Sequence, residues 1–338
     1  MEKFIRMTLA LLFLVAAGLA AEEKAGLFLI QQNGKWGYID KTGKVVISPQ
    51  FEFAKNFSEG MASVELNDQY GYIDAKFGKT GKFAIAPQYG LALDFSEGLA
   101  AVRVEGKFGY LDKTGKTAIK PQFDWASNFS GGRALVKVGG QYGFVNKSGA
   151  YAVNPQYSSA GDFSDGLARV KAGDKCGYID PAGKIAIEQP CYYLGDFSEG
   201  LAWVGVESYL GGITVKWGYL DKNGKRVIEL QFEKAGRFSE GLAPVKISGK
   251  YGYIDKTGKT VISPQFEDAY PFSEGLAKVR LGSSDSGKWG YVDKSGNLAV
   301  AAQFDYAEDF KQGLAEVIIN GKSGYIDRTG KYVWEPTK

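Results

Sequence analysis

The two cysteines, Cys176 and Cys191, are the residues best suited to chemistry, because the chain contains no histidine. Without histidine it lacks the commonest general base and the commonest metal ligand. The cysteines lie much further apart than those of a Cys-x-x-Cys redox motif, and no imidazole is present to activate a thiolate. The pair therefore suits a structural role better than a catalytic one.

Carboxylates recur along the chain without forming a recognisable catalytic set. One series of aspartates closes a motif of the type "GYID", and Asn146 fills the fourth place in it. The series is Asp40, Asp74, Asp112, Asp180, Asp221, Asp255, Asp293 and Asp327. A metal array would use such a column, but Asn146 and the lysines after several members favour a side chain bonded to its own turn.

A second series of carboxylates occupies the motif "SEG", and we expect these side chains to lie solvated at turn tips. Its members are Glu59, Glu97, Glu199, Glu240 and Glu274. The chain has no phosphate-binding loop, no serine elbow and no Cys/His cluster. We therefore expect a protein that is not an enzyme, with no cofactor and no metal site.

These residues belong to a repeat. The motif "KWGYID" recurs nine times with a base period of 34 residues, interrupted by insertions of 4, 7 and 4 residues. The copies begin at Lys35, Gln69, Lys107, Gln141, Lys175, Lys216, Lys250, Lys288 and Lys322. Nine copies at one period predict a repeat architecture rather than two globular domains.

Each unit has the pattern of three β-strands. In "GLAAVRV", Ala100 and Val102 alternate with Ala101 and Arg103, which predicts a strand with one inward and one outward face. The glycine of "DKTG" suits the tight turn between the second and third strands. We expect nine tandem antiparallel three-stranded units in an open superhelix or solenoid. A closed β-propeller is the alternative, although its blades usually have four strands and a longer repeat.

The motifs resemble those of a known family. The recurring "WG" or "YG", followed by "YIDKTGK", "PQF" and "FSEGLA", is similar to the WG-repeat (KWG-type) family of bacterial β-repeat proteins. The resemblance extends from Gly26 to Trp334. It implies a β-rich repeat protein and carries over no catalytic residues, so it indicates the fold class more than the function.

The aromatic residue of each motif varies together with the residue that follows the next "PQ". Seven units hold the pairs Trp36 and Phe51, Tyr70 and Tyr89, Phe108 and Phe123, Tyr142 and Tyr157, Trp217 and Phe232, Tyr251 and Phe266, Trp289 and Phe304. In the fifth unit the two positions hold Cys176 and Cys191. We infer that the two positions touch, and that these cysteines form a disulfide worth about 3 kcal/mol. Two free buried cysteines remain the alternative.

Two surface features are candidates for binding. The first is a basic column on the leading strands, formed by Arg103, Lys137, Lys171, Lys246 and Arg280. It could form a ridge for an anionic polymer. The alternative, a solvated strand face, is favoured because Glu65, Gly205 and Ile318 interrupt the column. The second is a possible ligand patch of Trp203 with Tyr209 and Leu210, which lie in the longest insertion. The alternative is that this insertion packs onto the neighbouring unit.

The N-terminal residues 1–20 have the features of a cleavable signal peptide. Lys3 and Arg6 precede an apolar run, and small residues lead to a cleavage site after Ala20. The run is too short to span a bilayer comfortably. Residues 22–338 then form the repeat array, and we expect a secreted or periplasmic protein with no transmembrane segment after cleavage.

The function expected from these features is binding rather than catalysis. A net charge of +3 gives no reason to expect a nucleic acid partner. Repeat arrays present extended surfaces that suit interaction. We expect a non-enzymatic exported protein that binds or scaffolds a protein partner at the cell envelope. A carbohydrate- or cell-wall-binding module that uses exposed aromatic residues is the alternative, so the partner is a protein or a polysaccharide.

Overall fold

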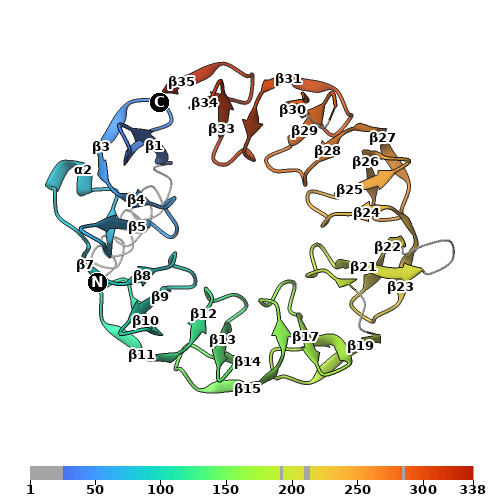
Figure 1. Ribbon diagram of the computed structural model, residues 1–338, viewed down its shortest axis with the longest axis horizontal. Coiled ribbons are helices and arrows are strands. Elements are labelled where there is room, and N and C mark those ends of the chain that lie inside the picture. Colours follow the sequence, from blue (N-terminus) through green and yellow to red (C-terminus); the bar gives the residue numbers. More distant parts are fainter. Residues whose placement is uncertain (1–25, 191–192, 209–213, 284–285, 338) are drawn as a thin grey trace, which may run out of the picture.

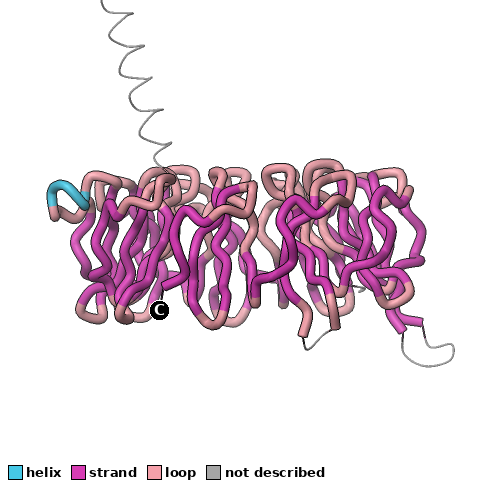
Figure 2. Tube along the Cα trace, turned by 90° about the horizontal axis from the view of Figure 1, so that it is seen from above, coloured by secondary structure: helices cyan, strands magenta, loops and turns pink. Residues whose placement is uncertain are grey.

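The protein is a ring of nine small β-sheets, each formed by one sequence repeat (Figure 1). The computed structural model describes residues 26–190, 193–208, 214–283 and 286–337. Within these ranges, eight sheets have four antiparallel strands and the first has three. Seen from the side, the strands run between two rims of turns and hairpins (Figure 2). This arrangement is a nine-bladed β-propeller.

The strands follow in chain order from blade to blade. Blade 1 contains β1 (Phe28–Gln32), β2 (Lys35–Ile39) and β3 (Val45–Phe51). Blades 2 and 3 contain β4 (Phe53–Ala54), β5 (Met61–Leu66), β6 (Gln69–Asp74), β7 (Ile85–Tyr89), β8 (Leu91–Ala92), β9 (Leu99–Val104), β10 (Lys107–Asp112) and β11 (Thr117–Phe123). Blades 4 and 5 contain β12 (Trp125–Ala126), β13 (Ala134–Val138), β14 (Gln141–Val145), β15 (Tyr151–Tyr157), β16 (Ser159–Ala160), β17 (Ala168–Ala172), β18 (Lys175–Ile179) and β19 (Ile185–Pro190).

The remaining blades repeat the same order. Blades 6 and 7 contain β20 (Tyr193–Leu194), β21 (Leu201–Ser208), β22 (Thr214–Asp221), β23 (Arg226–Phe232), β24 (Lys234–Ala235), β25 (Leu242–Ile247), β26 (Lys250–Asp255) and β27 (Thr260–Phe266). Blades 8 and 9 contain β28 (Asp268–Ala269), β29 (Ala277–Leu281), β30 (Lys288–Val292), β31 (Leu298–Phe304), β32 (Tyr306–Ala307), β33 (Leu314–Ile319), β34 (Lys322–Asp327) and β35 (Tyr332–Thr337). One short helix, α2 (Phe77–Thr80), interrupts the turn between β6 and β7.

The motif aspartates build the turns between the second and third long strands. In blade 3, the Asp112 carboxylate accepts hydrogen bonds from the backbone of Thr114 at 2.9 Å and of Lys116 at 3.1 Å. The Thr114 hydroxyl donates a third bond at 2.6 Å, and this bond does most to lower the pKa of Asp112. Asn146 makes the same backbone bonds in blade 4. These contacts confirm the turn-forming role predicted for the column.

The glycine of the "WG" motif is required by a close backbone approach. A Cβ atom on Gly109 would lie 2.5 Å from the carbonyl oxygen of Ile119 and 2.6 Å from the nitrogen of Pro121, which is closer than any side chain tolerates. The strand pairing shifts at this point, so that Phe108 lies opposite Phe123. The same register joins the paired aromatic positions in all seven units that carry them. Each pair also shares one apolar cluster, which confirms that the two positions pack together.

A column of buried rings, which the sequence pattern did not predict, joins neighbouring blades. The Tyr178 ring of blade 5 packs at 4.7 Å, centroid to centroid, on Phe197, which precedes the leading strand of blade 6. Its hydroxyl donates a 2.7 Å hydrogen bond to the Gly195 carbonyl, and burial raises the pKa of Tyr178. Equivalent ring contacts of 4.7–5.0 Å recur in seven other blades. Each contact stabilises a blade interface, both by burying apolar surface and by the favourable geometry of the two rings.

Because blades pack face to face, both faces of the leading strands are buried, and the predicted outward faces are wrong. Ala101 is 0% exposed, like Ala100 on the opposite face. Ser63 and Lys278, at the same strand position, are 1% and 5% exposed. These strands contact solvent only at their ends, for example at Arg103. The alternating polarity in the sequence therefore marks those ends and does not mark a solvated face.

The prediction of three-stranded units in an open superhelix is also wrong. In blades 2 to 9 the fourth strand is a two-residue segment that lies nearest the centre of the ring, too short to show a periodic pattern (Figure 1). The ring closes between blades 1 and 9, where Phe28 packs on Tyr325 at 5.6 Å and joins a shared apolar cluster with Leu314. Within the described residues no sheet combines strands from both ends of the chain. Closure therefore needs no divided blade.

Candidate functional site

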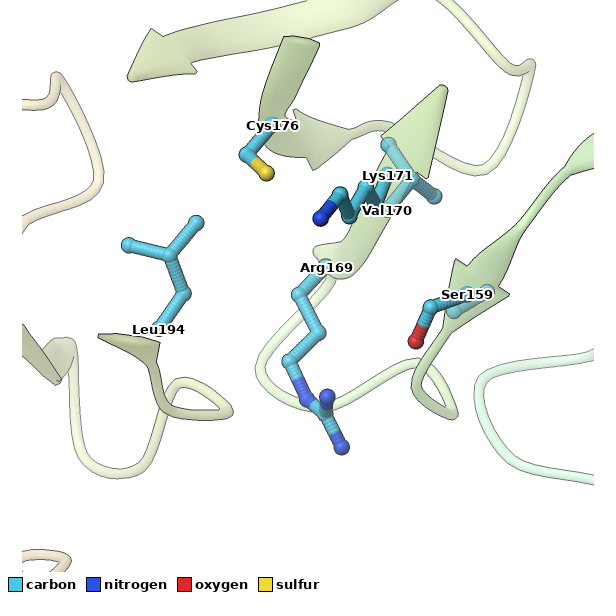
Figure 3. Close-up of a pocket in the computed structure, with 7 residues that line it drawn as sticks. Ser159, Arg169, Val170, Lys171, Cys176 and Leu194 are labelled. Atoms are coloured by element: carbon cyan, nitrogen blue, oxygen red, sulfur yellow. The ribbon is translucent and has the colours of Figure 1, made fainter. Parts of the chain in front are cut away.

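The candidate site is a cavity of about 120 Å³ between blades 5 and 6 (Figure 3). Strands β16, β17 and β18 of blade 5 form most of it, and β20 of blade 6 supplies one wall. The lining residues are Ser159, Ala160, Arg169, Val170, Lys171, Cys176 and Leu194. In Figure 3 the Cys176 sulfur, the Leu194 side chain and the Lys171 amine point into the same space.

The cavity exists because two positions that hold rings in blade 4 hold small residues in blade 5. In blade 4, Trp125 on the short strand packs on the motif residue Tyr142, with ring centroids 6.3 Å apart. The corresponding residues of blade 5 are Ser159 and Cys176, which pair with Lys171 as Trp125 and Tyr142 pair with Lys137. Protein interiors are normally close-packed, so the loss of two rings leaves a hollow.

The polar lining of the cavity is cationic. The Arg169 guanidinium Nε donates a 2.7 Å hydrogen bond to the Asp196 carboxylate, so this charge is paired. Lys171 is exposed and makes no ion pair with any residue that the structure describes. Val170, Leu194 and Ala160 supply apolar walls. The site therefore combines apolar contact with one uncompensated positive charge.

The predicted basic column is spread around the ring, one residue in each of five blades. In blades 4, 7 and 8 the cation lies over the ring of its own motif aromatic. The distances from the charged group to the ring centroid are 5.0 Å for Lys137 over Tyr142, 5.4 Å for Lys246 over Tyr251 and 5.8 Å for Arg280 over Trp289. Arg103 pairs across the strands with Phe108, and Lys171 pairs with Cys176. Of the five, Lys171 lines the cavity. A role in binding an anionic polymer stays a prediction.

The predicted disulfide and ligand patch fall partly on residues outside the described ranges. Cys176 is half-buried on β18 and lines the cavity, whereas Cys191 lies outside the described residues, so their bond stays a prediction. Trp203 is half-buried, with its ring 5.2 Å from that of Trp217 in an edge-on contact. Tyr209 and Leu210 lie outside the described residues, so the patch also stays a prediction.

The "SEG" glutamates join neighbouring blades, and the expectation that they are merely solvated is wrong. The Glu59 carboxylate of blade 2 accepts hydrogen bonds from the backbone nitrogens of Glu97 at 2.7 Å and Gly98 at 3.0 Å, in the corresponding turn of blade 3. The Lys113 ammonium lies 3.3 Å from the same carboxylate. Burial alone would raise the pKa of Glu59, but these amides and Lys113 lower it.

The serine of the same motif forms a second link between blades. Ser58 donates a 2.7 Å hydrogen bond to the Phe95 carbonyl of the next turn. Corresponding bonds start from Ser96, Ser130, Ser164, Ser198, Ser239 and Ser273. The recurrence of "FSEG" in the sequence was the available signal for this role, because a solvated turn tip has no need of a fixed serine and glutamate.

The described ranges contain neither a metal-binding cluster nor a helix able to span a membrane. No group of three or more Cys, Asp or Glu side chains there is placed to hold a metal ion. No helix in that part of the chain has the length and hydropathy needed to cross a membrane.

Comparison with one solved structure, which superposes over nearly the whole chain, supports the fold. A structure described as the eukaryotic initiation factor superposes with a TM-score of 0.66 at 12% identity, covering 93% of this chain and 96% of that one. Kluyveromyces lactis Hsv2p matches with a TM-score of 0.43 at 9% identity, covering 73% and 97%. At such identities the likeness to the initiation factor shows the fold alone.

Comparison at the sequence level identifies the repeat. No curated protein matches the chain. The family model described as "WG containing repeat" matches eight consecutive segments, at residues 36–70, 70–108, 108–142, 142–176, 177–208, 217–251, 251–283 and 289–322. These segments follow the blades from the motif aromatic of one blade toward that of the next. The chain therefore belongs to the WG containing repeat family.

Proposed function

We propose that the protein is a non-enzymatic scaffold that binds a protein partner around the central opening of the ring. The observation that carries this proposal is a set of exposed rings on the short strands nearest the centre (Figure 1). Its members are Phe53, Trp125, Tyr193 and Tyr306, between 38% and 48% exposed. The second residue of the same strands is buried or half-buried, so the strands are fixed while their first side chains face solvent.

Exposed aromatic rings next to cations suit a protein interface. Tyrosine, tryptophan and arginine are enriched at interaction hot spots, and aromatic rings supply large contact areas at little entropic cost. Lys137 lies beside one of these rings, because it pairs across the strands with Trp125. Exposed apolar residues on the outer strands, such as Val261 and Leu298, are mostly aliphatic. The inner rings are therefore the better candidates for binding.

Export to the envelope or exterior is part of the proposal. It is supported by the charged start, apolar run and small residues of positions 1–20. Fractionation of cells that express the full chain, with N-terminal sequencing of the product, tests it. A mature protein that begins at Ala21 outside the cytoplasm is expected. A cytoplasmic product that retains Met1 would contradict export.

Partner binding is tested by affinity purification of the full chain from its source organism, followed by mass spectrometry. The variant Trp125→Ser with Tyr306→Ser removes two inner rings, and Val261→Ser with Leu298→Ser is the matched control on the outer strands. We expect the first variant to lose a specific partner at least tenfold and the control to retain it. Equal recovery of all proteins by both variants would contradict the proposal. Loss of binding to cell-wall polysaccharide instead would favour the carbohydrate-binding alternative.

A further inference from the structure

We propose that the cavity between blades 5 and 6 receives a single phenol-type ring, the side chain of a tyrosine of the protein partner. This inference rests on the proposed scaffold function and names the chemistry by which one part of the ring recognises its partner. The cavity is distinct from the exposed rings of the short strands, because it lies in blade 5, where Ser159 and Cys176 replace the rings of blade 4.

Lys171 occupies a strand position at which other blades hold a cation over a ring. In blades 4, 7 and 8 the cation at this strand position lies within 5.8 Å of the centroid of a ring from its own blade. Lys171 has Cys176 opposite it instead of a ring. A ring that enters from outside restores the cation–π contact that those blades contain already, since the face of a ring attracts a cation.

The size of the cavity suits a single ring. The cavity has a volume of about 120 Å³. An apolar cavity of about 150 Å³ holds one benzene molecule, so a single six-membered ring approaches the capacity of this space and an indole exceeds it. The cavity is open on one side, where Ser159 is exposed, so the polar end of the ring stays near water. These dimensions select tyrosine or phenylalanine over tryptophan.

The lining of the cavity suits the side chain of a tyrosine. Val170, Leu194 and Ala160 give a ring its apolar contacts. The exposed Ser159 hydroxyl lies at the same cavity and can bond to a phenol oxygen, which favours tyrosine over phenylalanine. A carboxylate would meet one unpaired cation and three apolar walls, and desolvation would offset much of its attraction to Lys171. The ring is therefore the better complement.

The test uses p-cresol, the side chain of tyrosine, and acetate as the carboxylate probe, each titrated by NMR into the purified full chain. We expect p-cresol to bind with a Kd of about 1 mM, and acetate to bind at least tenfold more weakly. The variant Ser159→Trp gives blade 5 the tryptophan of blade 4, and it should weaken p-cresol binding at least tenfold. Leu91→Trp is the matched control, because it adds a tryptophan at the same strand position of blade 3, away from the cavity.

A second variant isolates the cation. Lys171→Met keeps the apolar stem and removes the charge, and it should weaken p-cresol binding about threefold, as expected for a partly exposed cation–π contact. Binding of p-cresol that is unchanged in Ser159→Trp would overturn the inference. Acetate binding that is tighter than p-cresol binding and lost in Lys171→Met would also overturn it, by showing a carboxylate site.

The outcomes separate this inference from the scaffold function. If Trp125→Ser with Tyr306→Ser abolishes capture of a partner and Ser159→Trp does not, the ring site is contradicted and the scaffold function is supported. Sensitivity of p-cresol binding to Ser159→Trp in a protein that captures no partner overturns the scaffold and leaves the ring site.

Discussion

Blades 4 and 5 share one architecture and differ in how they fill it. Both place a fully buried ring, Phe144 or Tyr178, against the next blade. Beside the cation of the leading strand, blade 4 has two further rings, Trp125 and Tyr142. Blade 5 has Ser159, Cys176 and a cavity at the same place. The comparison shows that the buried ring column is common to both blades and holds each against the next. The positions of Trp125 and Tyr142 in blade 4 differ in blade 5, and a distinct binding site can arise there.

The largest expected effect comes from the part that the two blades share. Tyr178→Ala and Phe144→Ala should each lower the free energy of unfolding by about 3–5 kcal/mol, because a buried ring leaves a cavity at a blade interface. Urea unfolding measures this, with the exposed Lys120→Ala as control. A loss below about 1 kcal/mol in either blade would break the comparison, because large costs are the rule for buried ring truncations.

A double substitution gives blade 4 the small residues of blade 5. Trp125→Ser with Tyr142→Ala removes the two half-exposed rings and should cost about 2–3 kcal/mol, less than a fully buried truncation. Introduced into the Ser159→Trp variant, these changes should restore p-cresol binding, now at blade 4 beside Lys137. NMR titration of the combined variant tests this. No recovery of binding would show that small residues and a cation do not suffice to make the site.

A smaller effect is expected from one hydroxyl. Tyr178 donates to the buried Gly195 carbonyl, and Phe144 has no such group. Tyr178→Phe should cost about 1–2 kcal/mol, because it leaves a buried carbonyl without its donor. Phe144→Tyr is the mirror change and should gain up to about 1 kcal/mol. Thermal unfolding of both variants measures the difference, and equal shifts of the same sign would contradict this account.

The smallest effect concerns the turns between blades. Blade 4 has Gly131 where blade 5 has Asp165, whose carboxylate accepts a 2.7 Å bond from the Gly200 nitrogen of blade 6. Gly131 has φ 60°, close to the 51° of Asp165, so an acidic residue fits the backbone. Gly131→Glu should add a similar link to blade 5 and gain about 0.5 kcal/mol at pH 7, after the cost of a left-handed residue.

The gain from Gly131→Glu should depend on pH. The amides and Lys113 around Glu59 lower its pKa below the ordinary 4.5, so the link stabilises the fold when the carboxylate is charged. Such a contribution is present above the unfolded-state pKa and is lost as the pH falls through the lower folded-state value. Unfolding measured at pH 7 and at pH 3 tests this. A gain that persists at pH 3 would show that the carboxylate is not its source.

Much of this comparison could be read from the sequence, and some could not. The paired columns of aromatic residues predicted that the two positions touch, as the strand register shows for the seven aromatic pairs. The small residues Ser159 and Cys176, in columns that hold rings in other blades, were a signal for the cavity. The buried faces were missed because alternating polarity assumes a sheet with one solvated side, whereas a propeller blade lies between two others. The closed ring was missed because closure depends on the angle between blades, which no single unit displays.

The closure between blades 1 and 9 has a mechanical consequence. Every hydrogen-bonded sheet of the described structure belongs to one continuous stretch of chain, and apolar contacts such as Phe28 with Tyr325 hold the two ends together. Parting the ends therefore costs side-chain burial at one interface and breaks none of the nine sheets. The interface between blades 1 and 9 can therefore open while each blade keeps its own sheet intact.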